Sequence, residues 1–296
     1  MLIHSLLKKY QGQFAVFGLL FGAVCWGVIW YPYRMMQEVG ISGVASSFYT
    51  YFLAVSIFAI IFLRQWRAAI HQPKIIILLA IVAGWTNLSY VLAIIDGEVM
   101  RVMLLFYLSP LWTLVLAHFW LKERTNMRGL AVIVLSLIGA FIMLWQEDAL
   151  PLPNNKAEWL ALSAGMGFSL TNVITRYAAN ITLPAKSMAV WIGVLLMSVV
   201  FIALQDAPFP HPQDMSMSQC LLMFLVAILL MAATLLVQFG ITHTPVNKAS
   251  VLFMFELVVA AVATYFLTDE TMTAREWFGG ALIVVAALFA ATNEHA

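Results

Sequence analysis

Residues 99–121 of the chain read VMRVMLLFYLSPLWTLVLAHFWL, a run in which nearly every side chain is apolar. A membrane-spanning helix needs about 20 mostly apolar residues, and this run is long enough. The strands of a membrane β-barrel would instead alternate polar and apolar residues in short segments. The run therefore predicts a helix that crosses a membrane.

The composition of the whole chain agrees with this prediction. Of its 296 residues, 63% are hydrophobic and only 10% are charged. Soluble domains have about 45–50% apolar and about 25% charged residues. So little charge could not cover the surface of a soluble chain of this length, and the soluble, disordered and fibrous classes are excluded. The net charge of +1 is too small to capture a polyanion, so no nucleic-acid partner is expected.

Similar apolar runs recur along the chain, separated by short polar segments. We predict an all-α polytopic membrane protein with ten transmembrane helices, at residues 14–33, 43–63, 75–95, 99–121, 129–146, 159–176, 187–204, 219–241, 247–267 and 277–292. Cys25 and Cys220 fall in or beside separate spans, and we expect packing residues rather than a disulfide.

The charged residues predict the orientation. Ten spans place both termini on one side of the membrane. If that side is the cytoplasm, eleven of the Lys and Arg residues face it, and four face outward: Arg34, Arg101, Lys156 and Arg275. Cytoplasmic loops carry an excess of Lys and Arg, so we predict cytoplasmic N- and C-termini.

The run at 99–121 has a counterpart later in the chain. At an offset of 147 residues, Leu105-Phe-Tyr-Leu-Ser-Pro-Leu-Trp-Thr113 lies on Leu252-Phe-Met-Phe-Glu-Leu-Val-Val-Ala260, and Arg101 lies on Lys248. An offset of 143 lays the first span on the sixth. The chain thus consists of two five-helix units. Because five is odd, the second unit enters the membrane from the opposite side, which is the inverted repeat of many secondary transporters.

Three short motifs carry a family resemblance: Cys25-Trp-Gly27, Phe106-Tyr-Leu-Ser-Pro110 with Glu123 thirteen residues on, and Asp269-Glu270 with Gly279-Gly280 nine residues on. In these motifs the chain resembles the EamA type of the drug/metabolite transporter superfamily. The resemblance implies two EamA-like domains, at 15–145 and 158–292. It also implies a permease or exporter of small metabolites in a bacterial inner membrane, without a cofactor. The chain departs from the family at Glu256-Leu257, where a proline is usual.

Glu256 is the sharpest single candidate for a functional role. It lies near the middle of the predicted span at 247–267, and a carboxylate at that depth costs a few kcal/mol. One interpretation is a carboxylate that binds a proton or another cation in the transport cavity. The alternative is a structural hydrogen bond to a neighbouring helix.

Arg101 and Lys248 begin the fourth and ninth spans at equivalent repeat positions. In the predicted orientation they lie at opposite mouths of the pathway, where each could attract an anionic group. The alternative, which we favour, is that both side chains reach the lipid headgroups, as long cations near span ends commonly do.

Polar and aromatic residues share helix faces in several spans. Asn172 and Arg176 lie one turn apart in the sixth span, and Trp26 and Trp30 lie one turn apart in the first. Together they could bind an amphipathic solute with a polar head. The alternative for the tryptophans is an interfacial aromatic belt, which suits Trp30 better than Trp26.

The third and eighth spans add three more candidates for a substrate cavity. Asn87 and Tyr90 are three residues apart in the third span, and Gln238 follows Thr234 by four in the eighth. Interhelical hydrogen bonds explain the same residues equally well.

These features favour a secondary transporter over an enzyme. Neither a phosphate-binding G-x-x-x-x-G-K-[ST] motif nor an H-E-x-x-H metalloprotease motif occurs in the chain. We predict export of a small metabolite, such as an amino acid or an amphipathic derivative, by alternating access and with coupling to a proton or another ion. The protein would act in membrane lipid as a monomer or homodimer. The open alternatives are a flippase for lipids or lipid-linked molecules and a facilitative channel.

Overall fold

The structure, a computed structural model, describes residues 10–62, 72–97, 99–143, 145, 153, 155–204, 209–267 and 273–292. These residues form helices and contain no strand, which confirms the all-α prediction. Seven helical stretches among them are long and apolar enough to cross a membrane. The apolar helices at Ser109–Leu121 and Met127–Met143 are shorter.

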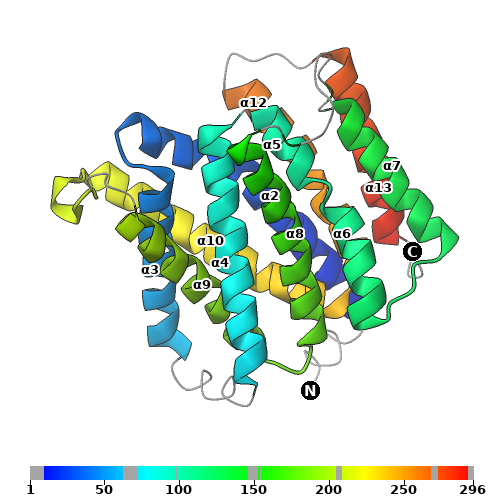
Figure 1. The fold of residues 1–296 in the computed structure, drawn as a ribbon, viewed down its shortest axis with the longest axis horizontal. Coiled ribbons are helices and arrows are strands. Elements are labelled where there is room, and N and C mark those ends of the chain that lie inside the picture. Colours follow the sequence, from blue (N-terminus) through cyan, green and yellow to red (C-terminus); the bar gives the residue numbers. More distant parts are fainter. Residues whose placement is uncertain are drawn as a thin grey trace.

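The described residues of the first half of the chain form six helices and one π-helical turn (Figure 1). They are α2 (Gln11–Glu38), α3 (Gly43–Phe62), α4 (Pro73–Asp96), α5 (Val99–Phe106), α6 (Ser109–Leu116), η2 (Ala117–Leu121) and α7 (Met127–Met143). The second half forms α8 (Lys156–Tyr177), α9 (Leu183–Leu204), the short 3₁₀ turn η3 (Pro212–Asp214), α10 (Met217–His243), α11 (Val246–Phe253), α12 (Phe255–Leu267) and α13 (Ala274–Thr292).

The helices of the two halves pack on each other in reciprocal pairs. Helix α4 packs against α8, and its counterpart α10 packs against α2. Likewise α5 and α6 pack against α8, while α11 and α12 pack against α2. Helix α7 packs against its own counterpart α13, side by side at one edge of the molecule, and α3 packs against α9 (Figure 1). Two similar units related by a two-fold axis make contacts of this reciprocal kind.

Two of the predicted spans, 99–121 and 247–267, are interrupted in the structure. The first is divided by a turn at Tyr107 and Leu108, and the second by a turn at Met254. Helices α5 and α11 correspond residue for residue at the offset of 147. The sequence prediction treated each span as one helix, and the interruption is a correction to it.

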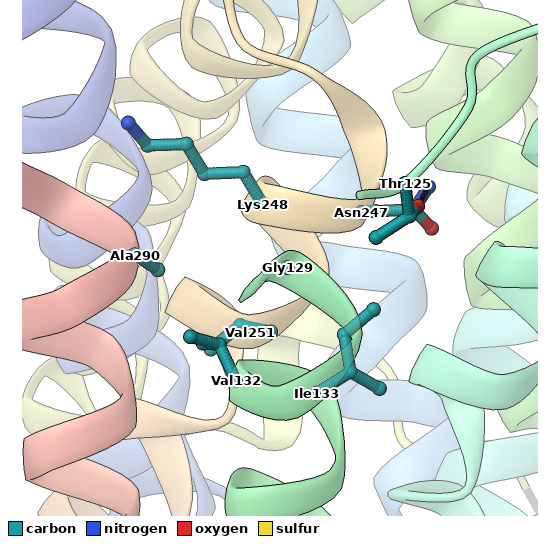
Figure 2. A pocket seen from close by; sticks show the side chains of 8 residues that line it. All are labelled: Thr125, Gly129, Val132, Ile133, Asn247, Lys248, Val251 and Ala290. Carbon is teal, nitrogen blue, oxygen red and sulfur yellow. Dashed lines mark hydrogen bonds between the residues drawn. The ribbon is translucent and has the colours of Figure 1, made fainter. Parts of the chain in front are cut away.

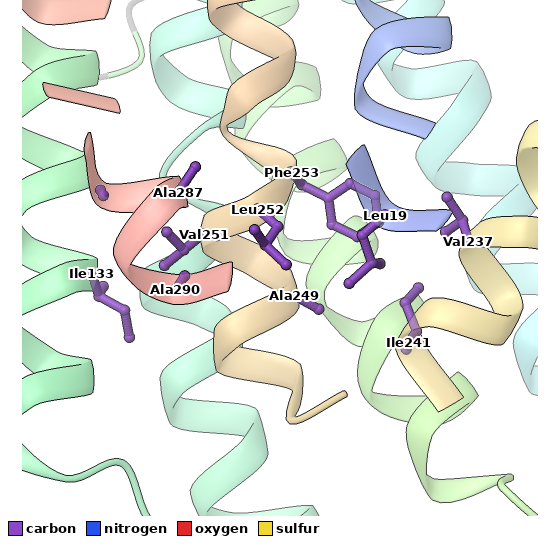
Figure 3. Close-up of a cluster of buried hydrophobic side chains, with 11 residues drawn as sticks. Leu19, Ile133, Val237, Ile241, Ala249, Val251, Leu252, Phe253, Ala287 and Ala290 are labelled. Atoms are coloured by element: carbon purple, nitrogen blue, oxygen red, sulfur yellow. The ribbon is translucent and has the colours of Figure 1, made fainter. Parts of the chain in front are cut away.

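One of the buried clusters where the two repeats meet is made of aliphatic side chains and Phe253. Figure 3 shows Leu252 and Phe253 of α11 beside Leu19 of α2, with Val237 of α10 on the far side. Helices α4 and α9 approach so closely that a Cβ on Gly193 would meet the backbone of Ala80. Small residues permit such close packing between helices in lipid, where the hydrophobic effect does not hold helices together.

The outer surface of the bundle is strongly apolar. Side chains such as Ile60, Leu204 and Phe266 are more than 70% exposed, at 78%, 75% and 77%. Monomeric soluble proteins rarely present so much contiguous apolar surface, whereas a bundle in lipid must. The exposed apolar surface therefore agrees with the composition in indicating a membrane protein.

Candidate functional site

The two helix interruptions have different local causes. Pro110 lies in the first turn of α6 and has no N–H to donate to the carbonyl of Phe106, so the helix cannot continue through this position. No proline lies beside Met254. There the amides of Met254 and Leu257 bond to carbonyls three residues back, each at 3.1 Å, which tightens the chain between α11 and α12. Repeat-equivalent positions are thus interrupted by different means.

Helix α8 packs directly onto the first interruption. Gly165 of α8 is buried, and a Cβ at this position would meet the carbonyl oxygen of Phe106. Ser169, one turn further on, donates a 2.7 Å hydrogen bond to the carbonyl of Ser109. The small residues of α8 therefore allow this helix to lie directly against the backbone between α5 and α6.

A continuous chain of aromatic rings links the two interruptions. Phe106 and Phe253, which are repeat equivalents, both pack against Phe168, with ring centroids 5.5 and 5.1 Å apart. Trp26 continues the chain from Phe253 at 6.3 Å, and Tyr90 continues it from Phe106 at 4.8 Å. This aromatic chain thus contains residues from both repeats, including the predicted cavity residues Trp26 and Tyr90.

Glu256 lies beside the second interruption, in the first turn of α12. The positive end of a helix dipole favours a carboxylate at this position. Tyr107 and Tyr90 belong to the same buried cluster as Met254 and Leu257, which flank this part of the chain. The Tyr107 hydroxyl is buried and has no partner at hydrogen-bonding geometry among the described residues. Glu256, Tyr107 and Tyr90 therefore place a carboxylate and two phenols beside the aromatic chain.

The other predicted polar residues lie in two separate regions. Asn87 donates a 3.2 Å hydrogen bond to the Tyr51 hydroxyl, within the first repeat. Asn172 and Gln238 are 2% and 3% exposed, on α8 and α10 of the second repeat. The side-chain nitrogen of Asn172 and the side-chain oxygen of Gln238 have no hydrogen-bond partner in the described part of the chain. The indole nitrogen of Trp30 also has none there. Buried polar atoms of this kind call for an explanation such as water or a bound solute.

Arg176 forms an ion pair, an arrangement the sequence analysis did not foresee. Its Nε donates to Glu123 Oε1 at 3.0 Å, and its Nη1 donates to the carbonyl of Thr242 at 2.5 Å. The second Glu123 oxygen accepts from the amide of Val246 at 3.0 Å, at the N-terminus of α11. These contacts join the end of the first repeat's broken helix to three helices of the second repeat. Arg176 is a structural connector in this conformation.

Lys248 and Arg101 lie near the starts of α11 and α5 at equivalent repeat positions, but only the side chain of Lys248 is described. Lys248 is 9% exposed and lines a small pocket with an empty volume of about 210 Å³, together with Thr125, Gly129, Val132, Ile133, Asn247, Val251 and Ala290. Figure 2 shows Asn247 beside Thr125, to which it donates a 2.8 Å hydrogen bond, while Lys248 extends in another direction. The part of it that a water-sized molecule could occupy is about 10 Å³, far below the range of about 300–1,000 Å³ for small-molecule pockets. The side chain of Arg101 lies outside the described residues.

Three residues near these contacts were not singled out as functional by sequence reasoning. Lys186 is completely buried, Phe168 joins the two repeats in the aromatic chain, and Tyr107 is buried at the first interruption. The signal that could have found Lys186 is a lone cation four residues into an apolar helix. No sequence signal indicated that Phe168 would pack between the two interrupted helices or that Tyr107 would lie in the cluster beside Glu256. Those contacts join segments that are distant in the sequence.

The two cysteines are not bonded to each other. Cys25 is buried, Cys220 is exposed, and both are free thiols. No group of three or more His, Cys, Asp or Glu side chains that could hold a metal ion occurs within the described ranges.

Taken together, the all-helical apolar bundle, its two reciprocal repeats and the paired helix interruptions define a polytopic membrane transporter rather than an enzyme. The EamA-like transporter family model matches residues 13–145 and 155–292. The chain belongs to this family, and it carries the family's domain twice.

Curated relatives agree with this assignment. The chain is 26% identical over 148 residues to the uncharacterized transporter PA0485 of Pseudomonas aeruginosa, covering 48% of the chain and 47% of that protein. An uncharacterized transporter of Archaeoglobus fulgidus is 24% identical, covering 72% of the chain and 74% of that protein. Protein RarD of Salmonella typhimurium is 23% identical, covering 54% of each. The chain thus matches about half the length of the first of these relatives.

A solved structure shares the fold. It is described only as "Crystal structure of protein", and it matches with a TM-score of 0.77 at 16% identity, covering 93% of the chain and 96% of the solved chain. At this identity the match supports the architecture alone.

Proposed function

We propose that the protein is a secondary transporter that exports a small amphipathic metabolite, such as an amino acid or a derivative, by alternating access. The observation that carries the proposal is the pair of interrupted helices at repeat-equivalent positions, joined by aromatic rings from both repeats. Transporters of this architecture bind substrate near the membrane midplane at interrupted helices. The aromatic chain would hold the apolar part of the substrate, and Glu256 with the two tyrosines would hold its polar head.

The proposal includes ten membrane spans in two inverted repeats. Three spans are added to the seven long ones: α5–α6–η2, α7 and α8. Helix α8 has 22 residues and extends about 33 Å at 1.5 Å per residue. This topology assigns Glu123, the end of α8 at Arg176 and the start of α11 at Val246 to one side of the membrane. Glu123 accepts a hydrogen bond from each of the other two residues. The excess of cations in the corresponding loops supports a cytoplasmic location for this side and for both termini, in a bacterial inner membrane.

Counterflow in proteoliposomes tests the transport function. Vesicles loaded with an amino-acid mixture should accumulate a labelled member of the mixture transiently, because a carrier exchanges solute whereas a channel lets it equilibrate. Empty liposomes are the control. Labelled solute that only equilibrates would support a channel, and no movement of any tested class would argue against the proposed substrates.

Proton coupling through Glu256 is a separable part of the proposal. The carboxylate lies at the interruption between α11 and α12, next to the buried cluster that contains Tyr107 and Tyr90. We expect Glu256→Gln to abolish solute-driven pH changes in proteoliposomes while counterflow continues, because exchange needs no net proton movement. Unchanged proton movement in this variant, with transport intact, would remove Glu256 from the coupling mechanism.

A further inference from the structure

Lys186 is an ionisable side chain inside a membrane span that the proposed function does not use. It lies in the first turn of α9, a helix long and apolar enough to cross a membrane. Its relative exposure is 0%, and it is among the largest fully buried side chains. Lysines within membrane spans are rare and usually functional.

The hydrogen bonds of Lys186 match those of an uncharged amine. Its Nζ donates to the carbonyl of Thr175 at 3.2 Å and to the Thr242 hydroxyl at 2.5 Å. The Thr242 hydroxyl donates its hydrogen to the carbonyl of Gln238 at 2.6 Å. Its oxygen therefore acts as the acceptor for Lys186. A neutral amine has two N–H groups and an ammonium has three. The two acceptors present match the two N–H groups of the neutral form, whereas an ammonium would keep one N–H without an acceptor.

The surrounding charges also oppose an ammonium at this position. Arg176 donates to the carbonyl of Thr242, the residue whose hydroxyl Lys186 contacts, so a second cation is held nearby. The carboxylate of Glu123 is already engaged, one oxygen with Arg176 and the other with the amide of Val246. No carboxylate in the described part of the chain pairs with Lys186. An unpaired buried charge is costly.

The other helices packed against α9 offer no counter-ion from their described residues. Helix α10 carries His243 next to Thr242, with Nδ1 at 2.8 Å from the carbonyl of Phe239. Helix α4 begins with the exposed Lys74, and α3 carries the tyrosines 49 and 51 near its opposite end. A proton on Lys186 would therefore require a change in the environment of the amine.

We propose that Lys186 is a second proton-binding residue of the transporter, neutral in the conformation described here and protonated when this end of the bundle opens. The inference rests on the proposed transport function and deepens its coupling mechanism. The step is Lys–NH₂ + H⁺ ⇌ Lys–NH₃⁺, with the proton taken from water. Gln238 Oε1 and Thr175 Oγ1 are buried without partners among the described residues, and they flank the two groups that Lys186 already contacts. Either oxygen can accept the third N–H after a small rearrangement.

A pH jump on proteoliposomes adsorbed to a solid-supported membrane tests this proposal without a solute. A proton that binds within the membrane dielectric produces a transient current. The experiment uses the Glu256→Gln background, so that this carboxylate contributes nothing. We expect the current to persist with Lys74→Met, a matched change at an exposed lysine, and to fall to the level of empty liposomes with Lys186→Met.

Two further variants keep the proposal falsifiable. Lys186→Arg is permanently charged and should also lose the current, while Thr242→Val should shift the pH at which the current is half-maximal. Thermal unfolding in detergent identifies a variant that has not folded, and Lys186→Gln then replaces Lys186→Met. A full current in any folded variant that lacks Lys186 would overturn the proposal. Counterflow in the unmodified protein is measured separately, so failure of the transport function is distinguished from failure of this inference.

Discussion

The two repeats share a scaffold but differ in chemistry. Helices α5 and α11 have corresponding boundaries, and both are followed by an interruption at the same repeat position. At equivalent positions, however, the first repeat has Ser109 and Tyr33 where the second has Glu256 and Arg176. The ionisable side chains inside the bundle are thus concentrated in the second repeat, while the first contributes tyrosines to the cluster beside Glu256.

This difference separates two requirements of the proposed mechanism. Alternating access needs two units with similar backbones, so that each can open toward one side of the membrane. Charge recognition and coupling need only one set of ionisable groups, and duplicating a buried charge would double its desolvation cost. The scaffold can therefore remain symmetric while the polar residues diverge.

The largest effect should come from two equivalent glycines, Gly165 and Gly22. A Cβ on Gly165 meets backbone of Phe106, whereas a Cβ on Gly22 meets the side chains of Val237 and Trp26, which can move. We expect Gly165→Ala to lower the free energy of unfolding by about 2–3 kcal/mol, as overpacking does. Gly22→Ala should cost less, about 1–2 kcal/mol, because side chains rather than backbone must shift.

Chemical denaturation in detergent measures this difference between the glycines. Gly280→Ala is the control, because its nearest neighbour is an ordinary contact at 3.8 Å. Equal losses for Gly165→Ala and Gly22→Ala would contradict the backbone approach of α8 to the first interruption.

A smaller effect is expected where the repeats are joined by Glu123. Glu123→Ala removes the ion pair with Arg176 and the cap on α11, so the unfolding free energy should fall by about 2 kcal/mol. Breaking a fully buried pair costs about 3–5 kcal/mol, but these side chains are 29% and 23% exposed. The unfolding midpoint in denaturant measures the loss.

The exposed pair between Arg34 and Glu38 is the matched control for Glu123. Its atoms are 3.6 Å apart and the side chains are 56% and 66% exposed. Glu38→Ala should change the unfolding free energy by no more than about 0.5 kcal/mol. A similar loss in both variants would mean that Glu123 does not hold the repeats together.

The smallest effect on stability should follow removal of the Tyr107 hydroxyl. This oxygen is buried without a described hydrogen-bond partner, so Tyr107→Phe should change the unfolding free energy by less than about 0.5 kcal/mol. Solute-driven proton movement should nevertheless fall, because Glu256 loses a neighbouring phenol. Met254→Leu, at the equivalent repeat position, should leave stability similarly unchanged. A large loss of stability in Tyr107→Phe would show that its hydroxyl is a structural bond.

Sequence reasoning succeeded where the information is periodic or local. The apolar runs predicted the helices, and the offset of 147 predicted the correspondence between the helices around Arg101 and Lys248. It also selected Trp26, Tyr90 and Glu256, which the structure brings to the interrupted helices. It did not predict the interruptions, although Pro110 was a local signal for the first. No such signal exists at Met254.

The chain's own sequence therefore determined the membrane environment, the helical class and the register of the two repeats, because each depends on composition or on spacing along one helix. Only the tertiary structure decided that Arg176 pairs with Glu123, that Lys186 lies buried against Thr242, and that Phe168 joins the two repeats. Those contacts link residues 53 to 85 positions apart. Whether a polar side chain in a span faces lipid, a pathway or another helix depends on how the helices rotate and pack.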